Sequence, residues 1–232
     1  MNSENIKIIF FDLDNTLFDH RRAEQSALRI LLHNLQEIFA SVNEEEFIRL
    51  YDKNNGIVWK KLAEGEISSQ ELKILRFQMT FDDLMITTAN AEEISERYLK
   101  IYTNQTFASP NVYETLKYLK PNYELGILSN GFSNIQESKL TNLRLNSFFK
   151  YKIYSGDAGA MKPSFKIFYQ AMNIAKAQAN EIAYVGDSYE DDIKGAKAVG
   201  WKAILYNPLR ESTNGGLADA EITDFLELKK IF

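Results

Sequence analysis

The sequence predicts an α/β protein: a doubly wound parallel sheet with an all-helical domain inserted into it. Several short runs are apolar throughout and end in polar residues, as strands buried on both faces do. Helical patterns separate these runs, and alternating strands and helices are typical of a parallel sheet. Residues 19–104 break the alternation and contain no convincing strand. A length of 232 residues suits one large domain, or a domain that carries a smaller insert.

The predicted strands follow in chain order. The clearest cover residues 6–11, which end at Asp12, residues 123–128, which end at Ser129, and residues 182–185, which end at Gly186. Weaker runs lie at residues 151–154, at 202–206 and near Ile222. Together they predict the sheet of the main domain.

The helices of the main domain lie between these runs. Ser109 has the character of an N-cap, with Pro110 at the first helical position and an apolar face formed by Val112, Leu116 and Leu119. Three further helices are predicted over residues 135–143, 165–175 and 191–199. Ser188 suits the cap of the last one.

The insert shows four helical patterns. Apolar residues recur at helical spacing from Leu28 to Phe39, from Phe47 to Leu62 and from Ile94 to Ile101. Ser68 and Glu71 fit a capping box. This box opens another helix, which lies between the second and the last of these patterns. We therefore expect residues 1–18 and 105–232 to form the core domain and residues 19–104 to form a separate lid-like domain.

Composition restricts the chemistry. The chain has no cysteine and only His20 and His33, which excludes thiol nucleophiles, thiolate zinc sites and His-rich metal sites. Oxygen ligands remain, and these favour Mg²⁺. A net charge of −5 argues against binding to nucleic acid polymers. The N-terminal apolar run is too short for a signal peptide or a membrane span, so we expect a cytoplasmic protein that binds no membrane.

Polar residues gather where the predicted strands end. Ligands bind outside the carboxyl ends of strands in such sheets. Asp12, Asp14 and Asp187 should meet there with Ser129 and Lys162. Clustered carboxylates repel one another unless a divalent cation lies among them. One carboxylate can attack phosphorus and a second can protonate the leaving oxygen, so the cluster suits phosphoryl transfer.

These motifs resemble those of the haloacid dehalogenase superfamily of phosphatases along the whole chain. The family's D-x-D-x-T motif matches residues 12–16, its Ser or Thr after the next strand matches Ser129, and its Lys before Pro matches Lys162. Its G-D-S motif, with a further acidic residue and G-A, matches residues 186–196. The resemblance implies a Rossmann-like core, a helical C1-type cap and Mg²⁺ as cofactor.

The resemblance also implies roles for single residues. Asp12 would be the nucleophile and a Mg²⁺ ligand, and Asp14 the general acid and base, with its backbone carbonyl on the metal. Asp187 would be the third protein ligand. Asp192 would lie just behind the metal, although Asp191 competes for that place. The phosphoryl group would be held by Ser129, Lys162 and Thr16, and Asn130 and Gly131 would help through the backbone.

Part of the insert resembles a narrower branch, the bacterial pyrimidine 5′-nucleotidases. The match consists of Asn55, Trp59, Gly65, Ile67, Arg76 and Phe77. It implies a small phosphorylated metabolite as partner, a nucleoside 5′-monophosphate, and Asn55, Trp59 and Arg76 as substrate contacts. Trp59 serves equally well as a core residue. For Arg76 the alternative is a surface charge, but substrate contact is favoured because a cap over an anionic ligand benefits from a cation. Sugar-phosphate and phosphoglycolate-type phosphatases share parts of the pattern and are the nearest alternative.

Other functions fit less well. A receiver domain of signalling proteins also uses an aspartyl phosphate, but it is much shorter and has no helical insert. A haloacid dehalogenase would not need Asp14, and a phosphomutase would require the substrate to retrieve its phosphoryl group before water does. His20 is expected in the linker to the cap and His33 within a helix. The chain is expected to be a monomer or a homodimer.

Overall fold

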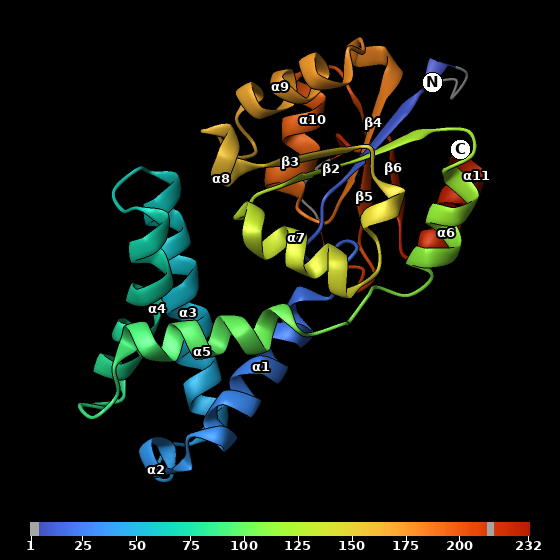
Figure 1. Cartoon of the computed structure of the whole chain (residues 1–232). Coiled ribbons are helices and arrows are strands. Elements are labelled where there is room, and N and C mark those ends of the chain that lie inside the picture. The colour runs from blue at the N-terminus through green and yellow to red at the C-terminus, as the bar shows by residue number, and fades with distance from the viewer. Residues whose placement is uncertain (1–4, 213–215) are drawn as a thin grey trace. The chain divides into compact units, whose positions relative to one another are not determined.

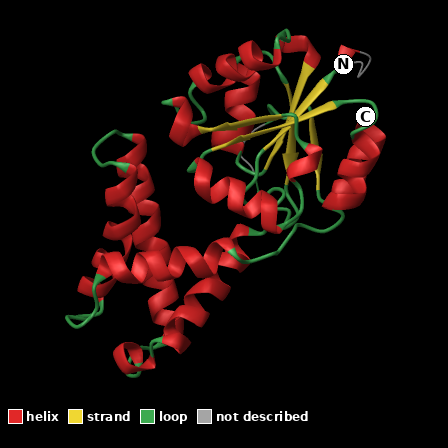
Figure 2. Cartoon of the chain, viewed as in Figure 1, coloured by secondary structure: helices red, strands yellow, loops and turns green. Residues whose placement is uncertain are grey.

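The computed structural model describes residues 5–212 and 216–232, and it divides into two compact units. Unit 1 comprises Met1–His20 and Thr106–Phe232, and unit 2 comprises Arg21–Gln105. Figures 1 and 2 show the sheet of unit 1 and the helices of unit 2.

Unit 1 is built on six parallel strands in the order β3-β2-β1-β4-β5-β6. The doubly wound sheet predicted from the sequence is therefore confirmed. The central strand β1 pairs with β2 on one side and β4 on the other. The strand bounds are Ile8–Phe11 for β1, Glu124–Ser129 for β2, Tyr151–Tyr154 for β3, Ile182–Gly186 for β4, Lys202–Tyr206 for β5 and Ala220–Ile222 for β6.

Helices cover both faces of this sheet (Figure 1). One face carries α9 (Phe165–Ala175) and α10 (Lys194–Ala198), and its core is centred on buried Trp201. The Trp201 ring stacks on Phe10 at 5.5 Å and meets the edge of Phe168 at 5.3 Å between centroids. The other segments of unit 1 are α6 (Val112–Leu119), α7 (Ser133–Asn142), η2 (Asn146–Phe148), α8 (Ser155–Ala158), η3 (Ala179–Glu181), η4 (Tyr189–Ile193), η5 (Phe225–Glu227) and α11 (Leu228–Ile231).

The predicted start of α6 is wrong. Pro110 lies in a turn, and the helix begins at Val112, after Asn111 in a left-handed conformation at φ 62°. Ser109 does not cap it, because the chain passes through Pro110 and Asn111 before the helix begins. The Ser109 backbone N–H donates to Leu17 O at 3.0 Å and joins this segment to the loop after β1.

Unit 2 consists of five helices among the residues that the structure describes. They are α1 (His20–Asn34, which begins at the last residue of unit 1), α2 (Gln36–Phe39), α3 (Glu44–Ala63), α4 (Ser69–Asp83) and α5 (Ala91–Thr103). The capping box of Ser68 and Glu71 is present at the start of α4. The predicted first helix is divided, because Leu35 leaves the helical conformation at φ −125° and ψ 42° before the short α2.

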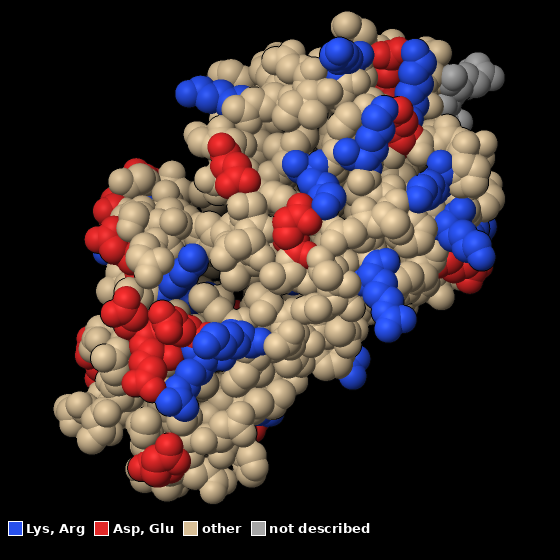
Figure 3. Space-filling model, in the orientation of Figure 1, with Lys and Arg blue, Asp and Glu red and all other residues tan. Residues whose placement is uncertain are grey.

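The surface mixes both signs of charge. On the face shown in Figure 3, basic and acidic side chains lie close to one another. Among the described residues, no helix has the length and apolar character needed to cross a bilayer.

Candidate active site

The site lies where the three central strands end. The parallel register places Phe11 beside Ile127 of β2 and Val185 of β4, so the residues that follow these positions share one edge. Asp12 continues the ladder, since its backbone N–H donates to Val185 O at 2.9 Å. Residues separated by more than a hundred positions in the sequence therefore meet at this edge.

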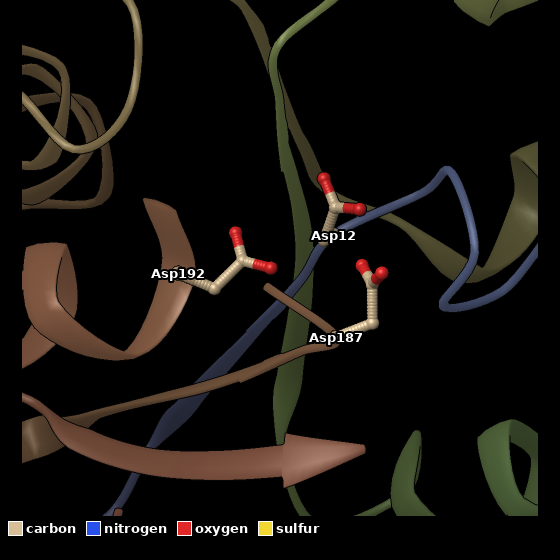
Figure 4. Close-up of side chains that lie close together, drawn as sticks. All are labelled: Asp12, Asp187 and Asp192. Carbon is tan, nitrogen blue, oxygen red and sulfur yellow. The ribbon is translucent and has the colours of Figure 1, made fainter. Parts of the chain in front are cut away.

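Three carboxylates converge there. Asp12 follows β1, Asp187 follows β4 and Asp192 comes from η4, and their side chains point toward one another (Figure 4). One oxygen of each lies within 4.8 Å of an oxygen of the others. Asp12 is only 6% exposed and Asp192 only 1%. Oxygen ligands at this spacing fit a hard divalent cation such as Mg²⁺.

The electrostatics of the cluster also favour a cation. Burial raises the pKa of Asp12 to about 7; Lys162 opposes this shift, and the negative charges of Asp192 and Asp14 add to it. Burial, followed by the charges of Asp12 and Asp192, raises the pKa of Asp187 to about 8. A bound divalent cation would favour the ionised form of both carboxylates and so offset the effect of burial on their pKa values.

Lys162 is the buried cation beside Asp12 and Asp192. Its Nζ donates to Asp12 Oδ1 at 2.7 Å, to Asp192 Oδ1 at 2.5 Å and to the Tyr184 hydroxyl at 2.8 Å. Burial opposes its charge, but Asp12 and Asp192 hold the pKa of Lys162 above its ordinary value. The side chain therefore presents a permanent positive charge beside Asp12.

Two backbone hydrogen bonds fix the position of Lys162. Asn130 Oδ1 accepts from the Lys162 backbone N–H at 2.8 Å, and Asn130 Nδ2 donates to Lys162 O at 2.9 Å. The Lys162–Pro163 peptide bond is cis. The Asn130 side chain thus ties the loop after β2 to the segment that carries the lysine, whereas the sequence suggested only a backbone role for Asn130.

Asp192, rather than Asp191, belongs to the carboxylate cluster. Its Oδ1 faces Lys162 and its Oδ2 accepts from the Ser188 backbone N–H at 2.9 Å. These contacts involve both oxygens of Asp192, and its predicted place behind a metal stays a prediction. Ser188 caps the following turn, because its side chain accepts from the Asp191 backbone N–H at 3.1 Å.

Thr16 reaches the cluster from the turn after β1. Its hydroxyl donates to Asp187 Oδ1 at 3.3 Å, and the residue is fully buried. The turn depends on Asn15, which adopts a left-handed conformation at φ 59°. Thr16 thus contacts Asp187, and its predicted contact with a phosphoryl group stays a prediction.

Asp14 and Ser129 contact helix α7. Gln136 Nε2 lies 2.9 Å from Asp14 Oδ2 and 2.8 Å from Ser129 Oγ, and Lys139 Nζ lies 2.5 Å from Asp14 Oδ1. Burial would raise the pKa of Asp14, but the charges of Lys139 and His20 and the hydrogen bonds from α7 hold it below its ordinary value.

Sequence reasoning missed Gln136, Lys139 and Tyr184. Tyr184 was hidden inside an apolar run, although its hydroxyl donates to Leu128 O at 2.7 Å and contacts Lys162. The sequence carries only a weak signal for Gln136 and Lys139: they lie three residues apart on one face of the helix that follows Ser129, but the sequence does not show what that face contacts.

The predicted cap contacts lie in unit 2. Arg76 Nη1 lies 3.4 Å from Asn55 Oδ1, and Asn55 Nδ2 donates to Glu24 Oε1 at 3.3 Å. The Arg76 guanidinium is 7% exposed and lies over the Tyr98 ring at 5.1 Å. Arg76 is thus a buried cation rather than a surface charge. Trp59 is half-buried on α3. The roles of Asn55, Trp59 and Arg76 in substrate contact stay predictions.

Comparisons with known proteins agree with this geometry. The family model described as haloacid dehalogenase-like hydrolase matches residues 9–206. The pyrimidine 5′-nucleotidase PynA of Streptococcus pneumoniae is 30% identical over 87% of this chain and 84% of its own. The glyceraldehyde 3-phosphate phosphatase of Methanothermobacter thermautotrophicus is 29% identical over 97% of this chain and 99% of its own. The structure of the HAD-hydrolase YfnB of Bacillus subtilis bound to magnesium superposes with a TM-score of 0.84 at 25% identity, over 98% of both chains.

Proposed function

Because this chain belongs to the haloacid dehalogenase-like hydrolase family, we propose that it hydrolyses phosphomonoesters with Mg²⁺ through a phosphate ester of Asp12. The observation that carries the proposal is the buried cluster of Asp12, Asp187 and Asp192 beside Lys162. Neither carboxylates alone nor a lysine alone would suit a phosphoryl group. Together they supply a nucleophile, a metal site and a fixed positive charge.

The proposed reaction has two steps, and each uses these side chains. Asp12 attacks phosphorus, and the bond between phosphorus and the leaving oxygen breaks as Asp14 gives that oxygen a proton. Asp14 then accepts a proton from water as the water attacks phosphorus and frees Asp12. Lys162 and Ser129 orient the phosphoryl oxygens throughout.

Mg²⁺ would be held by Asp12, Asp187 and the backbone carbonyl of Asp14, with Asp192 behind. When bound, it supplies charge neutralisation for the phosphoryl group. The residues present fit this ion, because their oxygens are clustered and the pKa values of Asp12 and Asp187 are raised by burial.

Dehalogenation suits the site less well. Displacing a halide requires neither a metal nor an acid for the leaving group, so the clustered carboxylates and Asp14 would have no task. A phosphatase uses all of them. We therefore assign the chain to phosphomonoester hydrolysis rather than to carbon–halogen chemistry.

We further propose nucleoside 5′-monophosphates as the substrate class. Support comes from the residues of unit 2 that resemble pyrimidine 5′-nucleotidases and from the similarity to PynA. A sugar phosphate is the second candidate, because the glyceraldehyde 3-phosphate phosphatase is almost equally similar over nearly the whole chain.

A substrate panel tests both levels of the proposal. Phosphate release is measured with nucleoside 5′-monophosphates, triose and sugar phosphates, and p-nitrophenyl phosphate, with Mg²⁺ and with EDTA. We expect Mg²⁺-dependent release and the highest kcat/KM for a nucleotide. Full turnover in EDTA would contradict the metal assignment, and a higher kcat/KM for a sugar phosphate would contradict the nucleotide assignment alone.

Trp59→Ala tests the contribution of unit 2 to this choice. Stacking of a base on an aromatic side chain is worth ~1–3 kcal/mol. The variant should therefore lose kcat/KM for nucleotides while it keeps most of its kcat/KM for p-nitrophenyl phosphate. An unchanged ratio would make Trp59 a residue of the core of unit 2.

A further inference from the structure

Helix α7 buries two polar side chains that the mechanism above does not use. Gln136 and Lys139 are three residues apart, so they share a helix face, and they are 1% and 2% exposed. Burying a lysine is costly unless a partner of opposite charge compensates. The contacts of these two side chains therefore call for a functional explanation.

Together the two side chains bind both oxygens of Asp14. Lys139 Nζ donates to Oδ1 at 2.5 Å and Gln136 Nε2 donates to Oδ2 at 2.9 Å. In its ionised form the carboxylate only accepts hydrogen bonds, which fixes the orientation of the Gln136 amide. Asp14 is thus held from two sides by groups on one rigid helix.

The same amide nitrogen also contacts Ser129. Gln136 Nε2 lies 2.8 Å from Ser129 Oγ, and since this nitrogen is a donor, the hydroxyl accepts. The hydroxyl hydrogen of Ser129 is then directed to another acceptor, as contact with a phosphoryl oxygen requires. One side chain therefore orders two groups that act on opposite parts of the substrate.

The surroundings are shaped for this contact. A Cβ at Gly131 would lie 2.5 Å from Gln136 Nε2 and 2.7 Å from its Cδ, so only glycine leaves room for the amide. Lys139 Nζ lies 5.1 Å from the centroid of the Phe18 ring, which covers the ammonium group on one side.

We propose that Gln136 and Lys139 are positioning residues that hold the Asp14 carboxylate in line with the leaving oxygen. The inference rests on the proposed function, in which Asp14 is the general acid and base. A displacement of about 1 Å at a reacting group can cost about 10²-fold in rate. Loss of either side chain should therefore lower kcat/KM most for substrates whose leaving oxygen needs a proton from Asp14.

The dependence on the leaving group provides the readout. An alkoxide needs a proton as it departs, whereas p-nitrophenolate is stable without one. We measure kcat/KM, which covers the steps through departure of the leaving group, for a simple alkyl phosphate and for p-nitrophenyl phosphate. The variants are Gln136→Met and Lys139→Met, with Lys139→Arg as the conservative replacement.

The ratio of kcat/KM for the alkyl ester to that for p-nitrophenyl phosphate should fall about tenfold or more in both Met variants, a part of the ~10²–10⁴-fold that general acid–base catalysis contributes in full. Lys139→Arg should restore most of it. The matched control is Lys152→Met, which removes a part-buried lysine that pairs with Glu137 of the same helix at 2.9 Å. This control should leave the ratio unchanged.

An unchanged ratio in folded Gln136→Met and Lys139→Met would overturn the proposal and make both side chains structural. A ratio that rises in Lys139→Met would also overturn it, because the charge of the lysine would then matter more than its position. If Lys139→Met does not fold, the ratio in Gln136→Met decides whether the proposal stands. This variant removes a neutral group, so it does not change the charge beside Asp14. Wild-type turnover of the panel tests the proposed function alone, so an inactive wild type and an unchanged ratio are distinct failures.

Discussion

Asp12 and Asp14 are two residues apart, yet the structure gives them opposite environments. Asp12 lies against two other carboxylates, and burial raises its pKa to about 7. Asp14 is held by Lys139 and Gln136, which outweigh burial and lower its pKa. The two proposed tasks are attack on phosphorus and proton transfer. A bound Mg²⁺ would favour the ionised form of Asp12 that attack requires, and the readily ionised Asp14 suits acceptance of a proton from water.

Asp14→Asn tests the second task. The amide cannot transfer the proton, so kcat should fall about 10²–10⁴-fold. Binding of inorganic phosphate as a competitive inhibitor should change little, because Ser129 and Lys162 remain. Near-normal kcat in this variant would contradict the role of Asp14.

Gly186→Ala tests the support of the metal site. A Cβ at position 186 would lie 2.7 Å from Asp192 Cβ and would overlap the carboxyl group of Asp192. The displaced carboxylate would leave Lys162 and the Ser188 N–H. We expect a several-fold higher Mg²⁺ concentration for half-maximal activity, in line with the about 10–100-fold cost of lost outer-shell partners. Gly216→Ala, with open space around its Cβ, is the control and should leave Mg²⁺ activation unchanged.

At the scale of elements, two glycines test the bounds of helix α3 in unit 2. Gly65 follows α3 in a left-handed conformation at φ 75°, whereas Gly56 lies inside α3 and a Cβ there would meet nothing within 4 Å. Gly65→Ala should lower the free energy of unfolding by about 1 kcal/mol, and Gly56→Ala should raise it by about 0.5–1 kcal/mol. Urea denaturation of both variants measures the two changes in the free energy of unfolding. Equal changes in the same direction would contradict the place of Gly56 inside α3 and of Gly65 after its end.

Elements governed by local pattern could be predicted from the sequence, and those governed by tertiary contact could not. Residues 151–154 and 202–206 form strands with the predicted bounds, and Ser68 begins α4 as its capping box indicates. Ser109 does not cap α6, because Asn111 in a left-handed conformation, which the sequence did not reveal, separates it from the first helical residue.

The candidate site follows the same division. The strand-end residues Asp12, Ser129 and Asp187 could be placed together because parallel strands end at one edge. Gln136 and Lys139 could not, because their importance depends on the side to which α7 turns its polar face. Tyr184 could not be singled out either, since a tyrosine in a buried strand is read first as core.

For the whole molecule, the raised pKa values link stability to pH and metal. In the metal-free protein Asp12 and Asp187 titrate at about 7 and about 8, against roughly 4 in an unfolded chain. Between pH values of roughly 4 and about 8, the folded state binds more protons than the unfolded state. These two groups therefore lower the free energy of unfolding as the pH rises through this range. Mg²⁺ relieves this penalty by replacing the protons.

The increase in Tm on adding Mg²⁺ should therefore be larger at pH 8.5 than at pH 6. Differential scanning calorimetry at both pH values measures it. Asp187→Asn removes one of the two groups and should reduce the difference between the two pH values. An equal Mg²⁺ effect at both pH values in the wild type would contradict the assignment of the metal to these carboxylates.

The central claim is that Asp12 accepts the phosphoryl group, and the most direct test is to locate the covalent intermediate. The protein is mixed with p-nitrophenyl phosphate and Mg²⁺, quenched in acid and reduced with borohydride, which converts an aspartyl phosphate to homoserine. Mass spectrometry of peptides from the wild type and from Asp12→Asn then locates the modification. The account predicts homoserine at position 12 in the wild type and no modified peptide in Asp12→Asn. Modification at another residue, or undiminished phosphate release by Asp12→Asn, would contradict it.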